Sequence, residues 1–316
     1  MKNLVSKRNL WLIVALCIVV VGAVIFGIFG FNGSVAYSDG YEVQIKTEID
    51  FKDNTEIIDE VAKDVFKDNK LSYGADYLIY NFDSHTVFAF KNEVEQEVLA
   101  ELYEEVYNAI NPAGTTNEID VTVEQFDTVS IDSQKILPVV LATLGAVVVL
   151  GVYLMFRQKF AAAFTVMAVT VINALVLCAL TALTRVVVVP AFYAVVIASM
   201  ALTLITAVGY TGRAKYATAK YAELAGASKK EVAENLENAN INFNAVVAVA
   251  GLIVALCMII FGPALVRWLG LTVVLSTISV AFTGVLVTPA IWVVFASMGR
   301  KDKYAYKPAE STGAEK

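Results

Sequence analysis

Six long apolar segments constrain this chain more than any other feature of its sequence. A helix rises about 1.5 Å per residue, so about 20 apolar residues cross a hydrocarbon core of about 30 Å. The segments that meet this length lie at residues 10–31, 136–156, 161–184, 186–212, 243–261 and 268–297. With 58% hydrophobic residues, the 316-residue chain is also far more apolar than a soluble protein. The sequence therefore predicts an α-helical polytopic membrane protein with six transmembrane helices.

The distribution of Lys and Arg predicts which helix ends face the cytoplasm, because short cytoplasmic loops are enriched in basic residues. Basic residues precede the first segment and follow the second, fourth and sixth: Lys2, Lys7, Arg8, Arg157, Lys159, Arg213, Lys215, Lys220, Lys229, Lys230, Arg300, Lys301, Lys303 and Lys307. The two short loops on the other side hold one basic residue each, Arg185 and Arg267. We therefore expect a multi-pass protein of the cytoplasmic membrane with both termini in the cytoplasm.

A soluble domain is expected on the outer side, between the first two helices. Residues 37–135 contain 23 Asp and Glu against 7 Lys and no Arg, a net charge of about −16. Alternating apolar residues predict four strands, and apolar residues at helical spacing predict two helices, in the order β-α-β-β-α-β. That order is typical of a small ferredoxin-like α+β domain. His85, the only histidine, is expected at the exposed tip of a hairpin.

The chain thus divides into six expected regions. Residues 1–36 hold the N-terminus and first helix, 37–135 the acidic α+β domain, 136–212 helices two to four, 213–242 a cytoplasmic connector, 243–298 the last two helices and 299–316 a disordered tail. A cleaved signal peptide is the competing interpretation of the first region. Its apolar run is longer than the ~7–15 residues of a signal peptide, which favours an uncleaved helix.

Polar residues gather on single faces of the predicted membrane helices. Ser199, Thr203, Thr206 and Tyr210 recur at i, i+4, i+7 and i+11, and two other helices carry related sets: Thr272, Ser276, Ser279 and Thr283 in the last, and Thr170, Asn173, Thr181 and Thr184 in the third. We interpret the hydroxyls as bonded to their own helix carbonyls, with a hydrated pathway as the alternative. Asn173 is the exception, because its amide needs partners that lipid does not supply.

The strongest motif precedes the fifth predicted helix, where four asparagines alternate with other residues and suggest a hinge: Asn238, Asn240, Asn242 and Asn244. The motif resembles Asn-x-Ser-Ile-Asn-x-Thr of SecF, a membrane subunit of the protein-translocation machinery. Other positions that match SecF are Tyr37 and Gly40 before the first strand, Arg213 after the fourth helix, Gly262 and Pro289. The resemblance extends to about residue 297 and includes the order of helices and outer domain. The sister subunit SecD is similar in its membrane half but has a larger outer domain.

The resemblance implies an accessory subunit that assists translocation of unfolded polypeptides together with SecD and the SecYEG channel. The chain departs from SecF in the fourth helix, where Thr206 stands in place of an aspartate, and at Val247, where an arginine is expected. No Asp, Glu or His occurs between Asp132 and Glu223, or between Glu237 and Asp302. Because hydroxyls and amides do not titrate near neutral pH, we expect no proton relay within this chain. Replacement of Thr206 should then alter assembly more than proton conduction.

Two other functions stay open from the sequence: a divergent half of an exporter of the resistance-nodulation-division (RND) type, and a non-transporting assembly scaffold. Cys17, Cys178 and Cys257 fall in three different predicted helices, and no Cys/His cluster occurs. We therefore expect neither a metal nor a cofactor. The sequence also lacks a phosphate-binding loop, and we expect no enzymatic activity and no nucleic-acid partner.

Overall fold

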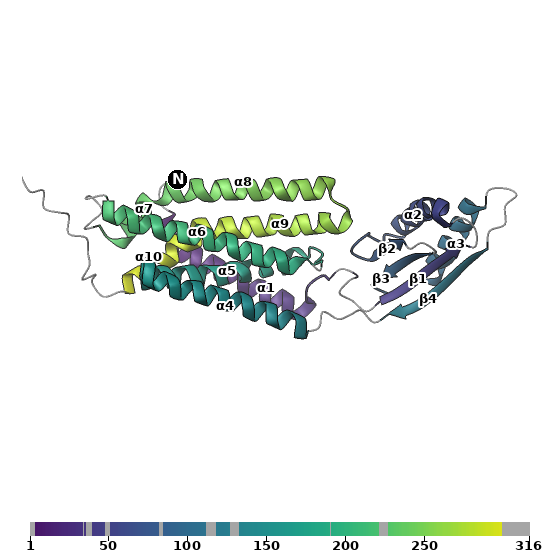
Figure 1. The fold of residues 1–316 in the computed structure, drawn as a ribbon, viewed down its shortest axis with the longest axis horizontal. Coiled ribbons are helices and arrows are strands. Elements are labelled where there is room, and N and C mark those ends of the chain that lie inside the picture. Colours follow the sequence, from purple (N-terminus) through teal and green to yellow (C-terminus); the bar gives the residue numbers. More distant parts are fainter. Residues whose placement is uncertain are drawn as a thin grey trace, which may run out of the picture.

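The computed structural model describes residues 4–33, 35, 40–47, 51–81, 85–111, 118–126, 133–189, 191–220 and 227–298. Its helices form an elongated bundle, and an α+β domain lies beyond one end of that bundle (Figure 1). Within these residues, six helices are long and apolar enough to cross a membrane. The prediction of a polytopic membrane protein with an α+β domain after its first helix is confirmed.

The bundle is built from long helices that follow the apolar segments of the sequence. They are α1 (Arg8–Phe29), α4 (Ser133–Gln158), α5 (Phe160–Thr184), α6 (Phe192–Lys220), α8 (Glu237–Phe261), and a last helix made of α9 (Ala264–Phe282), the π-helical turn η4 (Thr283–Val287) and α10 (Thr288–Met298). A short 3-10 turn, η1 (Val5–Lys7), precedes α1, and the short helix α7 (Lys229–Asn235) precedes α8.

Helix α5 is the centre of the bundle. It packs against α1, α4, α6, α9 and α10, and half of its span is buried, against 11% for the spans of α1 and α8. Helix α8 packs chiefly against α9 and leaves most of its surface open. Polar side chains on the inner face of α5 are therefore shielded from lipid. In this buried position they must find hydrogen-bond partners within the protein.

The α+β domain consists of β1 (Gly40–Thr47), α2 (Phe51–Asp68), β2 (Tyr77–Asn81), β3 (Thr86–Phe90), α3 (Gln96–Ile110) and β4 (Ile119–Phe126). Its four strands are antiparallel in the order β2-β3-β1-β4, which confirms the ferredoxin-like prediction. Both helices cover one face of the sheet, where Phe66 of α2 packs edge-on against Phe88 and Phe90 of β3. Burial in this core raises the pKa of the Tyr77 hydroxyl to about 12.

Several contacts among the described residues join the α+β domain to the bundle. Val35, just after α1, packs against Leu78 and Ala89 on the sheet face that α2 and α3 leave open. The Lys91 ammonium donates a hydrogen bond to the carbonyl oxygen of Gly33 at 3.0 Å. The indole N–H of Trp268 in α9 donates a hydrogen bond to the carbonyl oxygen of Tyr73 in the domain at 3.3 Å.

The asparagine motif differs from its interpretation as a hinge. Helix α8 begins at Glu237, so all four asparagines belong to one continuous helix that extends to Phe261. Helix α6 likewise extends to Lys220, eight residues beyond the end of the fourth apolar segment. Tyr37, residues 221–226 of the expected connector and residues 299–316 of the expected tail lie outside the described residues.

Candidate functional site

Asn173 lies where α5, α6 and the last helix meet, and its side chain is fully buried. Its Nδ2 donates a hydrogen bond to Oγ of Ser199 on α6 at 2.7 Å. Its Oδ1 accepts hydrogen bonds from Ser279 at 2.8 Å and from Thr283 at 3.2 Å. One amide thus links three helical segments, and we call these four residues the Asn173 cluster.

Two threonines of the fourth membrane helix bond within that helix, whereas Thr211 also donates to Oε1 of Gln158 on α4 at 2.8 Å. Thr203 donates to the Ser199 carbonyl at 2.9 Å, and Thr206 donates to the Thr203 carbonyl at 3.0 Å. Tyr210 is buried with its ring edge-on to Trp292, at 5.9 Å between centroids. Hydroxyls elsewhere in the bundle also bond to carbonyls of their own helix: Thr165, Thr170, Thr181, Thr184, Thr272 and Thr277. Ser276 of α9 is also buried. These bonds favour packing over a hydrated pathway.

The π-turn η4 follows from the proline that comes after it. Pro289 lacks an N–H group and its ring disfavours a regular helical turn before it. The wider turn is closed by Thr288, whose N–H and hydroxyl both donate to the carbonyl of Thr283, the latter at 2.9 Å. At this five-residue spacing Pro289 is the residue that would donate to the Gly284 carbonyl, and it cannot. Nδ2 of Asn240 on α8 supplies the missing donor at 2.9 Å.

Asn244 lies one turn after Asn240 on α8 and also contacts η4. Its Nδ2 donates to Oδ1 of Asn240 at 3.0 Å, and its side chain packs against Gly284 so closely that a Cβ there would collide with its Oδ1. Residues four apart share a helix face, so Asn240 and Asn244 point inward while Asn238 and Asn242 are exposed. We call Asn240, Asn244 and Gly284 the asparagine contact. It fixes α8 against η4.

Two of the positions that match SecF lie near the two ends of α8. The Arg213 guanidinium of α6 donates to the Ala239 carbonyl at 3.0 Å and lies 4.5 Å over the ring of Phe243. Gly262 ends α8, and its N–H donates to the Met258 carbonyl. Gly40, which also matches SecF, is the first residue of β1 and pairs with Phe126 of β4. It lies in the α+β domain, away from α8.

Glu237 and Gly284 are the residues of this region that sequence reasoning missed. Glu237, the first residue of α8, is only 7% exposed and accepts a hydrogen bond from the Leu4 N–H at 3.4 Å. A helical projection of the motif would have placed Glu237 one turn before Asn240, on the same face. Apart from this carboxylate at the helix start, the Asn173 cluster and the asparagine contact are neutral. They orient helices and do not exchange protons near neutral pH.

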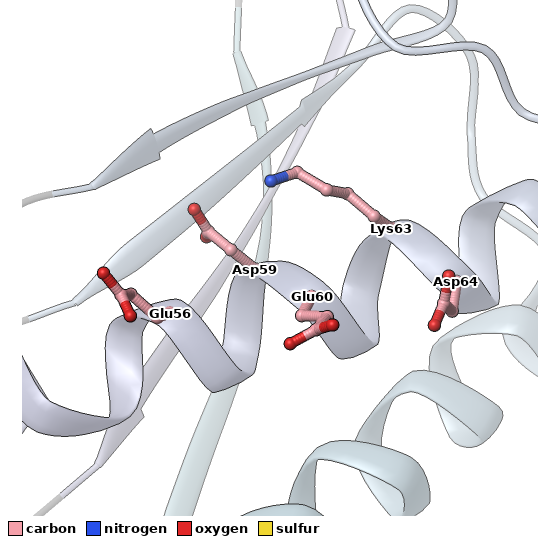
Figure 2. A pocket seen from close by; sticks show the side chains of 5 residues that line it. All are labelled: Glu56, Asp59, Glu60, Lys63 and Asp64. Atoms are coloured by element: carbon pink, nitrogen blue, oxygen red, sulfur yellow. The ribbon is translucent and has the colours of Figure 1, made fainter.

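An acidic hollow lies on the surface of the α+β domain. It measures about 360 Å³ on α2 and is lined by Glu56, Asp59, Glu60, Lys63 and Asp64. Figure 2 shows Glu60 and Asp64 pointing away from Asp59 and Lys63 rather than toward a common point. Asp59 already accepts a hydrogen bond from Asn81 at 2.8 Å. No metal-binding group of His, Cys, Asp and Glu occurs among the described residues, and we interpret the hollow as solvated surface.

Comparison with known proteins places this geometry in a known fold. No protein-family model and no curated protein matches the sequence. A crystal structure of SecDF in a super-membrane-facing form superposes with a TM-score of 0.71 over 94% of this chain, at 12% sequence identity. The chain has the SecDF fold.

A second SecDF crystal structure, from Thermus thermophilus and described as a translocon-associated membrane protein, matches with a TM-score of 0.58 at 12% identity. This chain again has 94% of its residues covered and spans 39% of the length of each SecDF chain. The resemblance to the SecD and SecF subunits is thereby confirmed for the fold.

Proposed function

We propose that this chain is a SecF-like subunit of a protein-export complex in the cytoplasmic membrane, with both termini in the cytoplasm and no enzymatic activity. In this proposal it works with a SecD-like subunit and the SecYEG channel while unfolded polypeptides cross the membrane. The observation that carries the proposal is the SecDF fold over 94% of the chain. The asparagine motif, where the sequence most resembles SecF, supports it independently.

The coverage of the SecDF structures agrees with the proposed SecD-like partner. The chain spans 39% of the length of each SecDF chain, and in the proposed complex the SecD-like subunit would correspond to the remaining length. The thinly covered helices α4 and α8, with spans 17% and 11% buried, leave surface for such a partner. The acidic α+β domain would contact the partner's soluble domain or the emerging chain.

Energy coupling is assigned to the partner. The Asn173 cluster consists of one amide and three hydroxyls, none of which changes its protonation near neutral pH. A transmembrane proton relay needs titratable groups at depth. In the proposed complex this chain is therefore a passive half, and carboxylates of the SecD-like subunit respond to the proton gradient.

The deciding experiment is recovery of the tagged full-length chain from its native membranes in mild detergent, followed by mass spectrometry. We expect a SecD-like chain in stoichiometric amount. An unrelated tagged six-helix protein, purified in parallel, controls for nonspecific recovery. Recovery of this chain alone, as a homo-oligomer that transports a small molecule, would replace the proposal with an RND-type exporter. A stable complex without translocation components would indicate an assembly scaffold.

A second experiment tests the passive role. Thr206→Val removes a hydroxyl that bonds only within α6, so proton-dependent export should persist in a complex that assembles normally. Loss of proton-dependent export in a normally assembled Thr206→Val complex would show that this half takes part in coupling.

A further inference from the structure

A basic hollow of about 250 Å³ lies at the end of the bundle opposite the α+β domain. It is lined by Ser6, Lys7, Arg8, Asn9, Leu10 and Lys230. Five of these residues are consecutive around the start of α1, whereas Lys230 comes from α7, more than 200 residues later. The fold therefore brings a third cation to a pair that the sequence already provides. Nothing in the proposed export function uses this hollow.

The segment that carries Lys7 and Arg8 is anchored by its neighbours. Val5 is buried in a cluster with Val232 and Ala233 of α7. The indole N–H of Trp11 donates to the Leu4 carbonyl at 3.1 Å, which folds the segment back onto α1. Because the chain is fixed on both sides of Lys7, the basic side chains stay beside α7 instead of trailing into solvent.

The hollow has an excess of positive charge. Lys230 lies 3.6 Å from the Glu234 carboxylate, with both side chains substantially exposed, so this pair is weak. Neither Lys7 nor Arg8 has an ion-pair partner among the residues that the structure describes. Of the other nearby acids, Glu231 accepts the Ser228 N–H in a capping box and Glu237 accepts the Leu4 N–H. Three cations thus line the hollow, and among the described residues only Lys230 forms an ion pair, with Glu234.

An exposed apolar track leads from the hollow along α1. Leu10 lines the hollow and is 50% exposed, and Ile13, Val20 and Val24 follow it at 57%, 51% and 55%. With the exposed Cys17, these residues occur at i, i+3, i+7, i+10 and i+14, which is one face of the helix. Cations at the end of a lipid-facing helix, above such a face, match a molecule with an anionic head and apolar chains.

We infer that the basic hollow binds the phosphate headgroup of an anionic phospholipid, whose acyl chains lie along the exposed face of α1. Lys7, Arg8 and Lys230 contact the phosphate, while Ser6 and Asn9 supply uncharged hydrogen-bond donors. A soluble phosphate compound shares the headgroup chemistry, but it would gain nothing from the apolar track. The inference does not depend on the proposed export function.

Native mass spectrometry of the full-length chain in detergent, titrated with phosphatidylglycerol or with phosphatidylcholine of the same acyl chains, tests the inference. We expect phosphatidylglycerol to bind more tightly. Each basic side chain near a membrane surface strengthens binding to anionic lipid about fivefold, so Lys230→Gln should weaken phosphatidylglycerol binding by about that factor. The triple variant Lys7→Gln, Arg8→Gln, Lys230→Gln should weaken it roughly a hundredfold. Phosphatidylcholine binding should not change.

Lys229→Gln is the matched control, because it removes the same charge from the same helix one residue outside the hollow. It should change phosphatidylglycerol affinity less than about twofold. Equal effects of Lys229→Gln and Lys230→Gln would overturn the site in favour of a diffuse basic surface, as would equal affinity for the two lipids. Displacement of phosphatidylglycerol by glycerol phosphate at millimolar concentration would identify a soluble-phosphate site instead. The single Lys230 variant, at an exposed position, keeps the test valid if the triple variant folds poorly.

Discussion

At the scale of single residues, Asn173 and Gly284 determine how the bundle closes. Asn173 satisfies donors and acceptors on three helical segments, and Gly284 lets the Asn244 side chain approach the backbone of η4. Both residues have a large effect on packing. The apolar interior offers Asn173 no alternative hydrogen-bond partners, and it leaves no free space beside Gly284.

Replacing Asn173 with Leu should destabilise the bundle. The substitution removes hydrogen bonds to Ser199, Ser279 and Thr283, and bonds between membrane helices contribute roughly 0.6 kcal/mol each on average. We expect a loss of about 2 kcal/mol, measured by thermal unfolding in detergent. Thr184→Val, at an exposed hydroxyl that bonds only within α5, is the control and should lose less than about 0.5 kcal/mol. Equal losses would show that the Asn173 cluster contributes nothing beyond local helix bonds.

Gly284→Ala should destabilise the bundle by about 1–3 kcal/mol, because the new Cβ would overlap Oδ1 of Asn244. In an Asn244→Ala background the same substitution should be tolerated better, with a coupling of at least about 1 kcal/mol in a double-mutant cycle. Gly145→Ala in α4, where a Cβ meets no neighbour, is the control and should be neutral or stabilising. Additive effects at positions 244 and 284 would contradict the close packing.

At the scale of helices, the last membrane helix and α8 form one unit. Pro289 interrupts the regular hydrogen bonding, η4 absorbs the interruption, and Asn240 of α8 bonds the freed Gly284 carbonyl. Helix α8 packs chiefly against α9, and the asparagine contact and Arg213 add polar contacts to η4 and α6.

Arg213→Gln should loosen the start of α8. The variant loses the cation–π contact with Phe243 and the charged hydrogen bond to Ala239, together worth about 1–2 kcal/mol. Hydrogen exchange in the first two turns of α8 should then become roughly tenfold faster, while exchange in α5 stays unchanged. Arg267→Gln, which bonds only at the opposite end of α8, should leave these amides unaffected. Unchanged exchange after Arg213→Gln would assign the position of α8 to the asparagine contact alone.

At the scale of the whole molecule, the α+β domain is held to the bundle by few contacts. Lys91 donates hydrogen bonds to Gly33 and Asn32, Trp268 donates one to Tyr73, and Val35 supplies an apolar contact. Such a small interface favours motion of the domain relative to the membrane once these contacts are lost.

The double variant Lys91→Gln, Trp268→Phe should free the α+β domain without unfolding it. Spin labels at Lys63→Cys on α2 and Leu141→Cys on α4, with the native cysteines replaced by alanine, report the separation of the two parts. We expect a broader distance distribution in the double variant than in the protein with Lys91 and Trp268 intact. Thermal unfolding provides the control and should be unchanged within about 1 kcal/mol. An unchanged distribution would mean that the Lys91 and Trp268 side chains do not hold the domain in place.

Hydropathy and residue pattern alone were enough to predict the membrane class, the six helices, the ferredoxin-like domain and the neutrality of the membrane segments after Asp132. Each of these follows from hydropathy, periodicity or residue identity within a single segment, and such patterns are local. The packed structure was needed to show that the asparagine motif is helical, with Asn240 and Asn244 against η4 and Asn238 and Asn242 outward. It also decided which hydroxyls meet Asn173, and that Lys230 joins Lys7 and Arg8. These pairings depend on how distant helices pack, and the spacing of residues along one helix carries no information about the face of another.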